Sequence, residues 1–447
     1  MDINLLLTVF IGLIFFIMIS MLRVKKSDPS PTVKEDSFKK LEKIKPDEPN
    51  TTFLGMTQRK KKIRVKNDST HFFVAGTTGS GKTVCLSNFV ESAVINNSPL
   101  VILDGKGDTG EGSLFDIVNK VSDKRNIYIV NLSDPSRSDK YNPFKDTEPD
   151  TVKDMLINLT EWTEPHYKLN SELYIQKVCN LLQQANIELG FKTIVEYLNP
   201  EQLSMLSKKL ADEKIITKEE HAQNGEFIKD IGKIASGSFA RFGTILASSL
   251  GTIFDEDGID ITTAIKENAI LLFVLNPLKY PELSPLIGKL IITDYKKAVS
   301  NNFGDTTRKL FMFDEISSYA NNGLLDLVNK SRSANCTCIL ATQSVMDLKV
   351  VSDNYHEQII ENCNSYIILR QNSAKGAEFW SDTIGTKATM QHTYQVDEDG
   401  ATGKGSVSEQ QIYLYHPNVI KALTTGQAIY INKNNGFHTR LSINKPF

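Results

Sequence analysis

Short apolar runs alternate with helix-like stretches near the start of the chain and again in its second half. HFFVAG (71–76), PLVILDG (99–105) and NIYIVNL (126–132) are almost continuously apolar, whereas residues 83–96 have helical spacing. Further runs of the same kind lie at 269–278, 309–315, 336–344 and 365–372. Apolar strands separated by helices indicate a parallel sheet that is covered on both faces. The pattern therefore predicts an α/β fold with a parallel-type central sheet.

The middle of the chain lacks such runs. TVKDMLINLTEWT (151–163), SELYIQKVCNLLQQANIEL (171–189) and PEQLSMLSKKLADE (200–213) are amphipathic with helical spacing. We therefore expect an all-α domain at 146–240, inserted between two parts of the α/β domain at 56–145 and 241–447. Residues 386–410 are polar with several glycines and predict an extended loop or a hairpin.

The N-terminus contains one long apolar segment. Residues 5–22 carry no charge and would span ~27 Å as a helix, about one hydrocarbon core. Arg23, Lys25 and Lys26 follow directly, which predicts a single-pass membrane anchor with the bulk of the chain in the cytoplasm. A cleaved signal peptide would need a basic start and a small-residue cleavage site, and neither is present. The anchor and its basic flank cover 1–26, and a charged tether follows at 27–55.

Composition narrows the choice of partners. The 447 residues have a net charge of −2, which does not fit a protein that coats DNA. Between Arg23 and Thr70 there are 14 Lys/Arg and 7 Asp/Glu, so this stretch has an excess of positive charge. Because it lies beside the apolar segment, its partner is expected to be anionic lipid rather than nucleic acid. The five cysteines lack zinc-ligand spacing and indicate reduced core thiols. The seven histidines show no HExxH spacing, and there is no GxSxG motif.

The strongest motif is G-x-x-x-x-G-K-T, which follows an apolar run and opens a helix, as a phosphate-binding loop requires. It consists of Gly76, Thr77, Thr78, Gly79, Ser80, Gly81, Lys82 and Thr83. Glycines let the backbone surround phosphates, whose charge meets the N–H groups at the helix N-terminus. Lys82 would reach the β- and γ-phosphates, and the Thr83 hydroxyl would bind Mg²⁺. The alternative is a glycine-rich turn that contains a lysine by chance.

A second acidic centre follows the run KLFMF (309–313). A buried strand would place Asp314 and Glu315 at the carboxyl edge of the sheet, where ligands bind. Asp314 would hold Mg²⁺ through water, and Glu315 would orient and activate the attacking water. By itself, an apolar run that ends in two acids is a weak signal, because many strands end in acidic turns.

Three further polar residues and one turn are candidates for the same site. Gln343 lies near the end of the run CTCILATQS (336–344), where it would contact the γ-phosphate; otherwise it is a solvated strand-end residue. Arg332 lies on the expected helix between the two strands and could reach the nucleotide of a neighbouring subunit, and Arg370 is a second candidate for that role. DGKGD (104–108) would lie beside the phosphates, although alone it is only a charged turn.

Taken in order, these motifs resemble those of the type IV secretion coupling ATPases, the TraG/TraD-type branch of the FtsK–HerA class of P-loop motors. The resemblance covers about residues 70–445 and rests on the following elements: AGTTGSGKT, ILDGKGD, YNPF (141–144), FMFDEI, KSRSANCTCILATQS and AEFWSDTIGTK (377–387). It implies a RecA-like domain that binds ATP and Mg²⁺, with an inserted all-α domain. It also implies a homo-hexameric ring with DNA in its channel, anchored in the cytoplasmic membrane.

The function that the resemblance implies is delivery of single-stranded DNA, with its attached relaxase, to a type IV secretion channel. Two alternative functions remain. A double-stranded DNA translocase of the FtsK type would normally add a winged-helix domain, for which no sequence remains. A membrane docking protein that binds ATP without hydrolysis has no need of Glu315. The DNA-contacting residues are open; loops near 241–255 or 386–410 are candidates.

Overall fold

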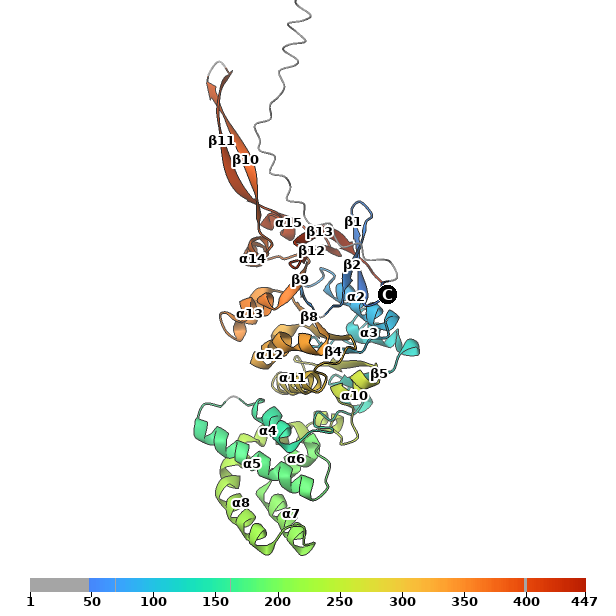
Figure 1. The fold of residues 1–447 in the computed structure, drawn as a ribbon, viewed down its shortest axis with the longest axis vertical. Helices are drawn as coiled ribbons and strands as arrows, with labels where there is room; N and C mark the ends of the chain where they lie inside the picture. The colour runs from blue at the N-terminus through green and yellow to red at the C-terminus, as the bar shows by residue number, and fades with distance from the viewer. Residues whose placement is uncertain (1–47, 69, 161, 398–399) are drawn as a thin grey trace, which may run out of the picture.

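One large mixed sheet forms the centre of the molecule (Figure 1). The computed structural model describes residues 48–447 except 69, 161 and 398–399. The sheet has 11 strands in the order β2-β1-β13-β12-β9-β3-β8-β7-β4-β6-β5. The predicted membrane segment at 5–22 lies outside the described residues. Within 48–447, no described helix is both long and apolar enough to cross a bilayer.

The strands from β9 to β5 are parallel and correspond to the apolar runs of the sequence. They are β3 (His71–Ala75), β4 (Leu100–Asp104), β5 (Ile127–Asn131), β6 (Ile270–Val274), β7 (Lys309–Asp314), β8 (Cys336–Thr342) and β9 (Cys363–Ile368). Ala75 pairs with Thr342, and Asp104 pairs with Asp314, so the carboxyl ends of these strands meet at one edge. The prediction of a parallel sheet is confirmed for this part.

The other edge of the sheet is antiparallel, which the apolar pattern did not predict. It consists of β1 (Thr51–Thr57), β2 (Lys62–Lys66), β12 (Gln427–Asn432) and β13 (Phe437–Ile443). β1, β2 and β13 are only partly buried, and alternation of buried and exposed positions gives a weaker signal than a continuous apolar run. Residues 51–55, expected in the tether, therefore belong to the sheet.

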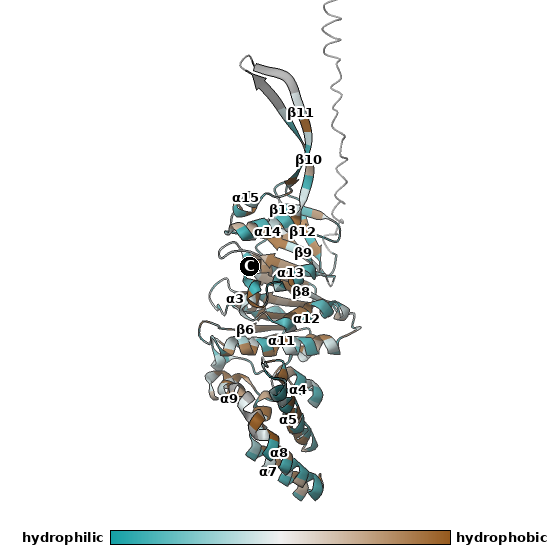
Figure 2. Cartoon of the chain, turned by 90° about the vertical axis from the view of Figure 1, so that its left-hand side faces the viewer, coloured by the Kyte–Doolittle hydropathy of each residue, from teal (hydrophilic) through white to brown (hydrophobic). Residues whose placement is uncertain are grey.

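Two hydrophobic cores cover the two faces of the sheet. Alternate β3 residues divide between them, with Phe72 in one core and Phe73 in the other, as the side-chain period of a strand requires. The Phe72 face packs against α2 (Lys82–Ile95) and α3 (Leu114–Asn119). The Phe73 face packs against α10 (Ile261–Lys266), α11 (Leu283–Asn301), α12 (Asn322–Ser331), α13 (Tyr355–Glu361) and α14 (Ala374–Ile384). Figure 2 shows apolar colour in the strands between these layers.

Helices alone occupy one end of the molecule, as the sequence predicts for its middle part (Figure 1). They are α4 (Pro149–Ile157), α5 (Pro165–Gln184), α6 (Phe191–Tyr197), α7 (Pro200–Asp212), α8 (Lys218–Ser238) and α9 (Ala240–Ala247). Helical structure thus continues beyond residue 240, and η3 (Ser249–Ile253) follows. The prediction of a loop near 241–255 is therefore wrong. Apolar residues such as Phe242 and Ile253 are buried, and they hold α9 and η3 against the core.

A two-stranded hairpin projects at the opposite end of the molecule (Figure 1). β10 (Thr386–Asp397) and β11 (Gly400–Tyr413) pair with each other in a sheet of their own, and α15 (Pro417–Lys421) follows. Of the two forms expected for 386–410, the structure has the hairpin.

A buried polar cluster joins the helical segment to the sheet domain. The Lys297 ammonium lies 2.8 Å from Asp260 Oδ2 and 3.1 Å from Asp294 Oδ1. It also donates to the carbonyl oxygens of Pro143 (2.9 Å) and Lys145 (3.3 Å). The Tyr141 hydroxyl donates to Asp294 Oδ2 at 3.1 Å. The YNPF motif is thus the joint that leads from the sheet into α4.

Candidate nucleotide-binding site

The glycine-rich motif forms the turn between β3 and α2 at the carboxyl edge of the sheet. Gly79 (φ 73°) and Gly81 (φ 102°) have the left-handed conformation that glycine adopts without steric cost. α2 has no side chain that caps its N-terminus, so its first N–H groups remain free for an anion. Lys82 and Thr83 are its first two residues, and both are half-buried.

Three neighbouring segments fix the path of this loop. The Gly76 N–H donates to the Thr342 carbonyl at 3.2 Å, and the Thr77 N–H donates to the Arg370 carbonyl at 3.0 Å. The third segment is the turn before β12. There, the Gly426 N–H donates to the Ser80 carbonyl at 2.9 Å, and the Thr425 hydroxyl donates to the Gly79 carbonyl at 2.9 Å. Sequence reasoning missed Thr425 and Gly426, since a TTG turn before a strand carries no chemical signal.

Side chains at and directly after the ends of β7 and β8 meet the loop. Lys82 Nζ donates to Glu315 Oε2 at 2.9 Å and lies 3.7 Å from Asp314 Oδ1. The Gln343 amide donates to the same Glu315 oxygen at 3.2 Å. Its oxygen accepts a hydrogen bond from the Thr78 hydroxyl at 3.2 Å. Residues separated by more than 200 positions in the sequence are thus brought together at one sheet edge.

The backbone at Glu315 is strained. Its φ of 52° and ψ of 51° place a non-glycine residue in the left-handed region, which costs about 1–3 kcal/mol. Hydrogen bonds hold this conformation. The Glu315 N–H donates to Asp314 Oδ1 at 3.0 Å, and the Ser317 hydroxyl donates to Glu315 Oε1 at 3.1 Å. Such strain is concentrated at functional sites, where it sets the direction of a side chain.

The site has an excess of buried negative charge. Burial, together with the charge of Asp314, raises the pKa of Asp104 to about 7. Burial also raises the pKa of Asp314, although the Lys82 ammonium opposes the shift. Lys106 also lowers the pKa of both acids, but its ammonium pairs with Asp108 at 2.9 Å on the surface. A cation bound beside Asp314 would therefore stabilise the ionised acids.

This donor set fits Mg²⁺ that is shared with a polyphosphate. Within the described ranges of 48–447, no three His, Cys, Asp or Glu side chains form a metal cluster. A metal ion here would thus need further oxygen ligands, and phosphate oxygens with the Thr83 hydroxyl would supply them. Mg²⁺ commonly binds in this way, through one or two carboxylates and substrate phosphates.

The two arginine candidates lie at different places. Arg332 is exposed at the C-terminus of α12, where it begins the 3-10 turn η5 (Arg332–Ala334). It precedes β8 and lies near His71, the first residue of β3, so it belongs to the amino edge of the sheet, away from its own phosphate loop. Arg370 lies beside that loop, and its Nε is buried without a hydrogen-bond partner.

Comparison with known proteins gives one family. Residues 62–422 match the sequence profile described as the type IV secretion-system coupling protein DNA-binding domain. The type 4 coupling protein DotL of Legionella pneumophila is 21% identical over 408 residues, covering 75% of this chain and 52% of the relative. The chain therefore spans about half the length of this curated relative.

Solved structures share the fold. The bacterial conjugative coupling protein TrwB, without its first 70 residues, superposes with a TM-score of 0.63 at 16% identity, over 88% of this chain and 89% of that one. The structure of TrwB with ADP and Mg²⁺ superposes with a TM-score of 0.60 at 16% identity, over 85% of this chain and 86% of that one. VirB4 of Thermoanaerobacter pseudethanolicus superposes with a TM-score of 0.55 at 12% identity, over 88% of this chain and 96% of that one.

Proposed function

We propose that this chain, which belongs to the family of type IV secretion-system coupling proteins, is an ATP-driven motor that transports DNA. The observation that carries the proposal is the contact network of Lys82, Glu315, Gln343 and Thr78 at an uncapped helix N-terminus. It combines a phosphate-binding cation with a carboxylate that can activate water. Structures of TrwB with an ATP analogue and with ADP and Mg²⁺ support these ligands.

In this proposal, each side chain has a separate task. The backbone of Gly76–Thr83 surrounds the phosphates of ATP, and Lys82 neutralises the β- and γ-phosphates. Thr83, and Asp314 through water, would hold Mg²⁺, which would supply positive charge beside the phosphates. Glu315 orients the attacking water and accepts its proton, and Gln343 contacts the γ-phosphate.

We further propose that the chain forms a homo-hexameric ring in which Arg332 acts on the nucleotide of a neighbouring subunit. Its position at the edge opposite its own phosphate loop supports action in trans. Arg332→Ala and Lys82→Ala subunits should each be inactive alone. A mixture of them should regain part of the hydrolysis, because an intact loop then meets an intact arginine. A mixture as inactive as its components would remove Arg332 from this role.

The cellular context is proposed from the family and the sequence. The chain would be anchored in the cytoplasmic membrane by residues 5–22 and would deliver relaxase-bound single-stranded DNA to a type IV secretion channel. The helical segment α4–α9 would receive this cargo. The competing hypothesis of a double-stranded DNA translocase predicts tighter binding of duplex than of single-stranded DNA, which a gel-shift comparison would reveal.

Lys82→Ala tests the motor directly. Loss of this ammonium should reduce ATP binding and abolish both hydrolysis and DNA transfer between cells. Lys106→Ala is the matched control, since Lys106 lies near the same edge but pairs with Asp108 in solvent. Hydrolysis and transfer that persist in Lys82→Ala would refute the proposal.

A further inference from the structure

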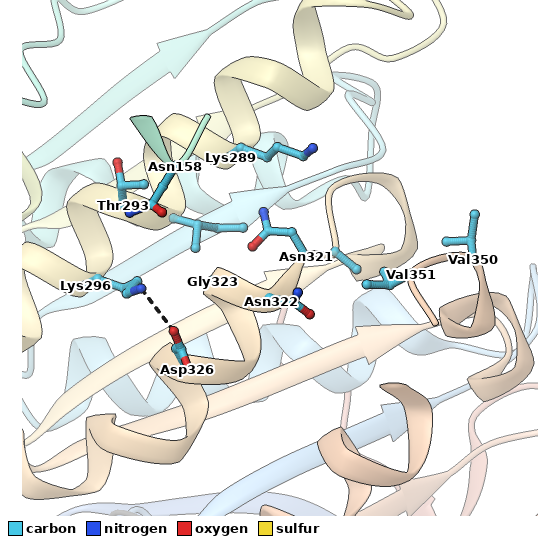
Figure 3. A pocket seen from close by; sticks show the side chains of 12 residues that line it. Asn158, Lys289, Thr293, Lys296, Asn321, Asn322, Gly323, Asp326, Val350 and Val351 are labelled. Carbon is cyan, nitrogen blue, oxygen red and sulfur yellow. Dashed lines mark hydrogen bonds and ion pairs between the residues drawn. The ribbon is translucent and has the colours of Figure 1, made fainter. Parts of the chain in front are cut away.

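A cleft of about 680 Å³ lies on the α11 side of the sheet domain, next to the helical segment. Figure 3 shows its side chains. Lys289 and Lys296 come from α11, Asn322 and Asp326 come from α12, and Asn158 comes from the end of α4. Val350 forms its rim and is 78% exposed. None of these residues belongs to the nucleotide site.

The charges and donors of the cleft suit a phosphodiester backbone. Lys289 and Lys296 are two helical turns apart, ~10.5 Å along α11, so they could contact successive parts of an extended strand. Asp326 pairs with Lys296 at 3.3 Å, but a half-exposed pair of this kind is weak and can exchange for a phosphate. Asn158 and Asn322 are exposed amide donors, a residue type that commonly contacts phosphate oxygens.

The start of α12 adds a favourable dipole. The Asn321 side chain accepts a hydrogen bond from the Leu324 N–H at 3.0 Å and caps the helix. Asn322, the first helical residue, is exposed beside this cap, and α12 has no acidic residue in its first turn. The partial positive charge of the helix N-terminus therefore adds to that of the two lysines.

Two walls of the cleft are connected to the hydrolysis site. Asn321 and Asn322 follow Glu315 through η4 (Ile316–Ser318), and Val350 follows Gln343 through η6 (Val345–Val350). The Tyr355 hydroxyl donates to the Asn321 carbonyl at 2.7 Å and ties the two walls together.

A second contact anchors the α12 wall beneath the acids. The Tyr319 hydroxyl donates to the carbonyls of Asp314 (3.0 Å) and Leu103 (3.1 Å). A Cβ on Gly288, the neighbour of Lys289, would lie 3.0 Å from Tyr319 Cβ, so α11 packs closely on this residue. Tyr319 therefore links the strand that carries the acids to α11 and to the start of α12.

We propose that this cleft binds the sugar–phosphate backbone of the transported DNA strand through Lys289, Lys296 and Asn322. The inference rests on the proposed motor function, because a motor of this kind has to hold the phosphodiester backbone of the strand that it transports. The small number of lysines in the cleft fits this use. A motor must release its strand, and many phosphate contacts would bind it too tightly.

The test measures the affinity of the full-length chain for a fluorescein-labelled single-stranded DNA over a series of salt concentrations. The double variant Lys289→Gln, Lys296→Gln should bind on the order of tenfold more weakly. The slope of log K against log salt should fall by about 1.4, ~0.7 for each lost contact. Lys330→Gln removes an exposed lysine at the other end of α12 and should bind like the wild type.

Asn322→Asp separates a local effect from misfolding. A carboxylate in the first turn of α12 favours the helix, so the unfolding temperature should stay level or rise. DNA affinity should nevertheless fall, because the new charge repels phosphate. Wild-type affinity and salt slope in both the lysine double variant and Asn322→Asp would overturn the assignment of the cleft. Absence of DNA binding by the wild type would overturn the motor function itself.

Discussion

Replacement of Lys297 by methionine should destabilise the joint between the sheet domain and the helical segment. The side chains of Lys297, Asp260 and Asp294 are each at most 3% exposed, so methionine would leave two buried carboxylates without their cation. Removal of one partner from a buried ion pair costs about 3–5 kcal/mol. The Pro143 and Lys145 carbonyls would also lose their donor. We expect a loss of stability at the upper end of this range.

The pH dependence makes this prediction specific. Burial raises the pKa of Asp294 to about 6, although Lys297 opposes the shift. Burial also acts on Asp260, but the Lys297 ammonium outweighs it and lowers the pKa of that carboxyl. Without the ammonium, both acids should take up protons more readily in the folded state. The destabilisation by Lys297→Met should therefore be largest at neutral pH and above, and should shrink as the pH falls. The Asp294 part should be lost by about pH 6, and the Asp260 part at lower pH.

Urea unfolding of the wild type, Lys297→Met and Lys296→Met at several pH values provides the assay. Lys296 is the matched control, because it is the neighbouring lysine of α11 but is partly exposed. Asp294→Asn in the Lys297→Met background should recover part of the lost stability. A loss below about 1 kcal/mol, or a loss that does not change with pH, would refute the reasoning that the cluster depends on its cation.

Two further predictions concern the β3 strand and the phosphate loop. Burial lowers the pKa of His71 to about 4, so the unfolded chain binds a proton below about pH 6.5 while the folded chain does not. Stability should fall by about 3 kcal/mol as the pH drops from 6.5 to 4, and His71→Gln should flatten that slope in urea unfolding; an unchanged slope would contradict this. Gly426→Ala should weaken ATP binding roughly threefold to tenfold in a calorimetric titration, since φ is 77° and its N–H holds the Ser80 carbonyl. Gly436→Ala, at φ 68° in the β12–β13 turn, should leave ATP affinity unchanged. Equal losses of ATP affinity in both variants would contradict the idea that Gly426 holds the phosphate loop in place.

The parallel half of the sheet could be predicted because its strands are buried on both faces. Leu100–Asp104 and Ile270–Val274 are buried at every position, and a continuous apolar run records this directly. β1 and β13 could not be found in the same way. Each lies in the antiparallel part with exposed positions, and their pairing joins residues near 55 to residues near 443. No local pattern encodes such a distant contact.

The residues of the nucleotide site likewise fall into those that a local sequence pattern predicts and those that it does not. Gly76–Thr83 and the Asp314–Glu315 pair each carry a local signal, because phosphate binding needs glycines before a helix and acids after a strand. The contacts of Thr425 and Gly426 with the loop depend on tertiary structure alone. The same holds for the left-handed backbone of Glu315 and for the Tyr319 hydroxyl that bridges two strands.

The measurement that tests the central claim most directly is ATP turnover by Glu315→Gln. Glutamine preserves the size of the side chain but cannot accept the proton of the attacking water. The variant should bind ATP with an affinity close to that of the wild type, while steady-state phosphate release falls by about 10²-fold or more. Phosphate release at the wild-type rate would show that Glu315 does not activate water, and the account of this site as the centre of a motor would be wrong.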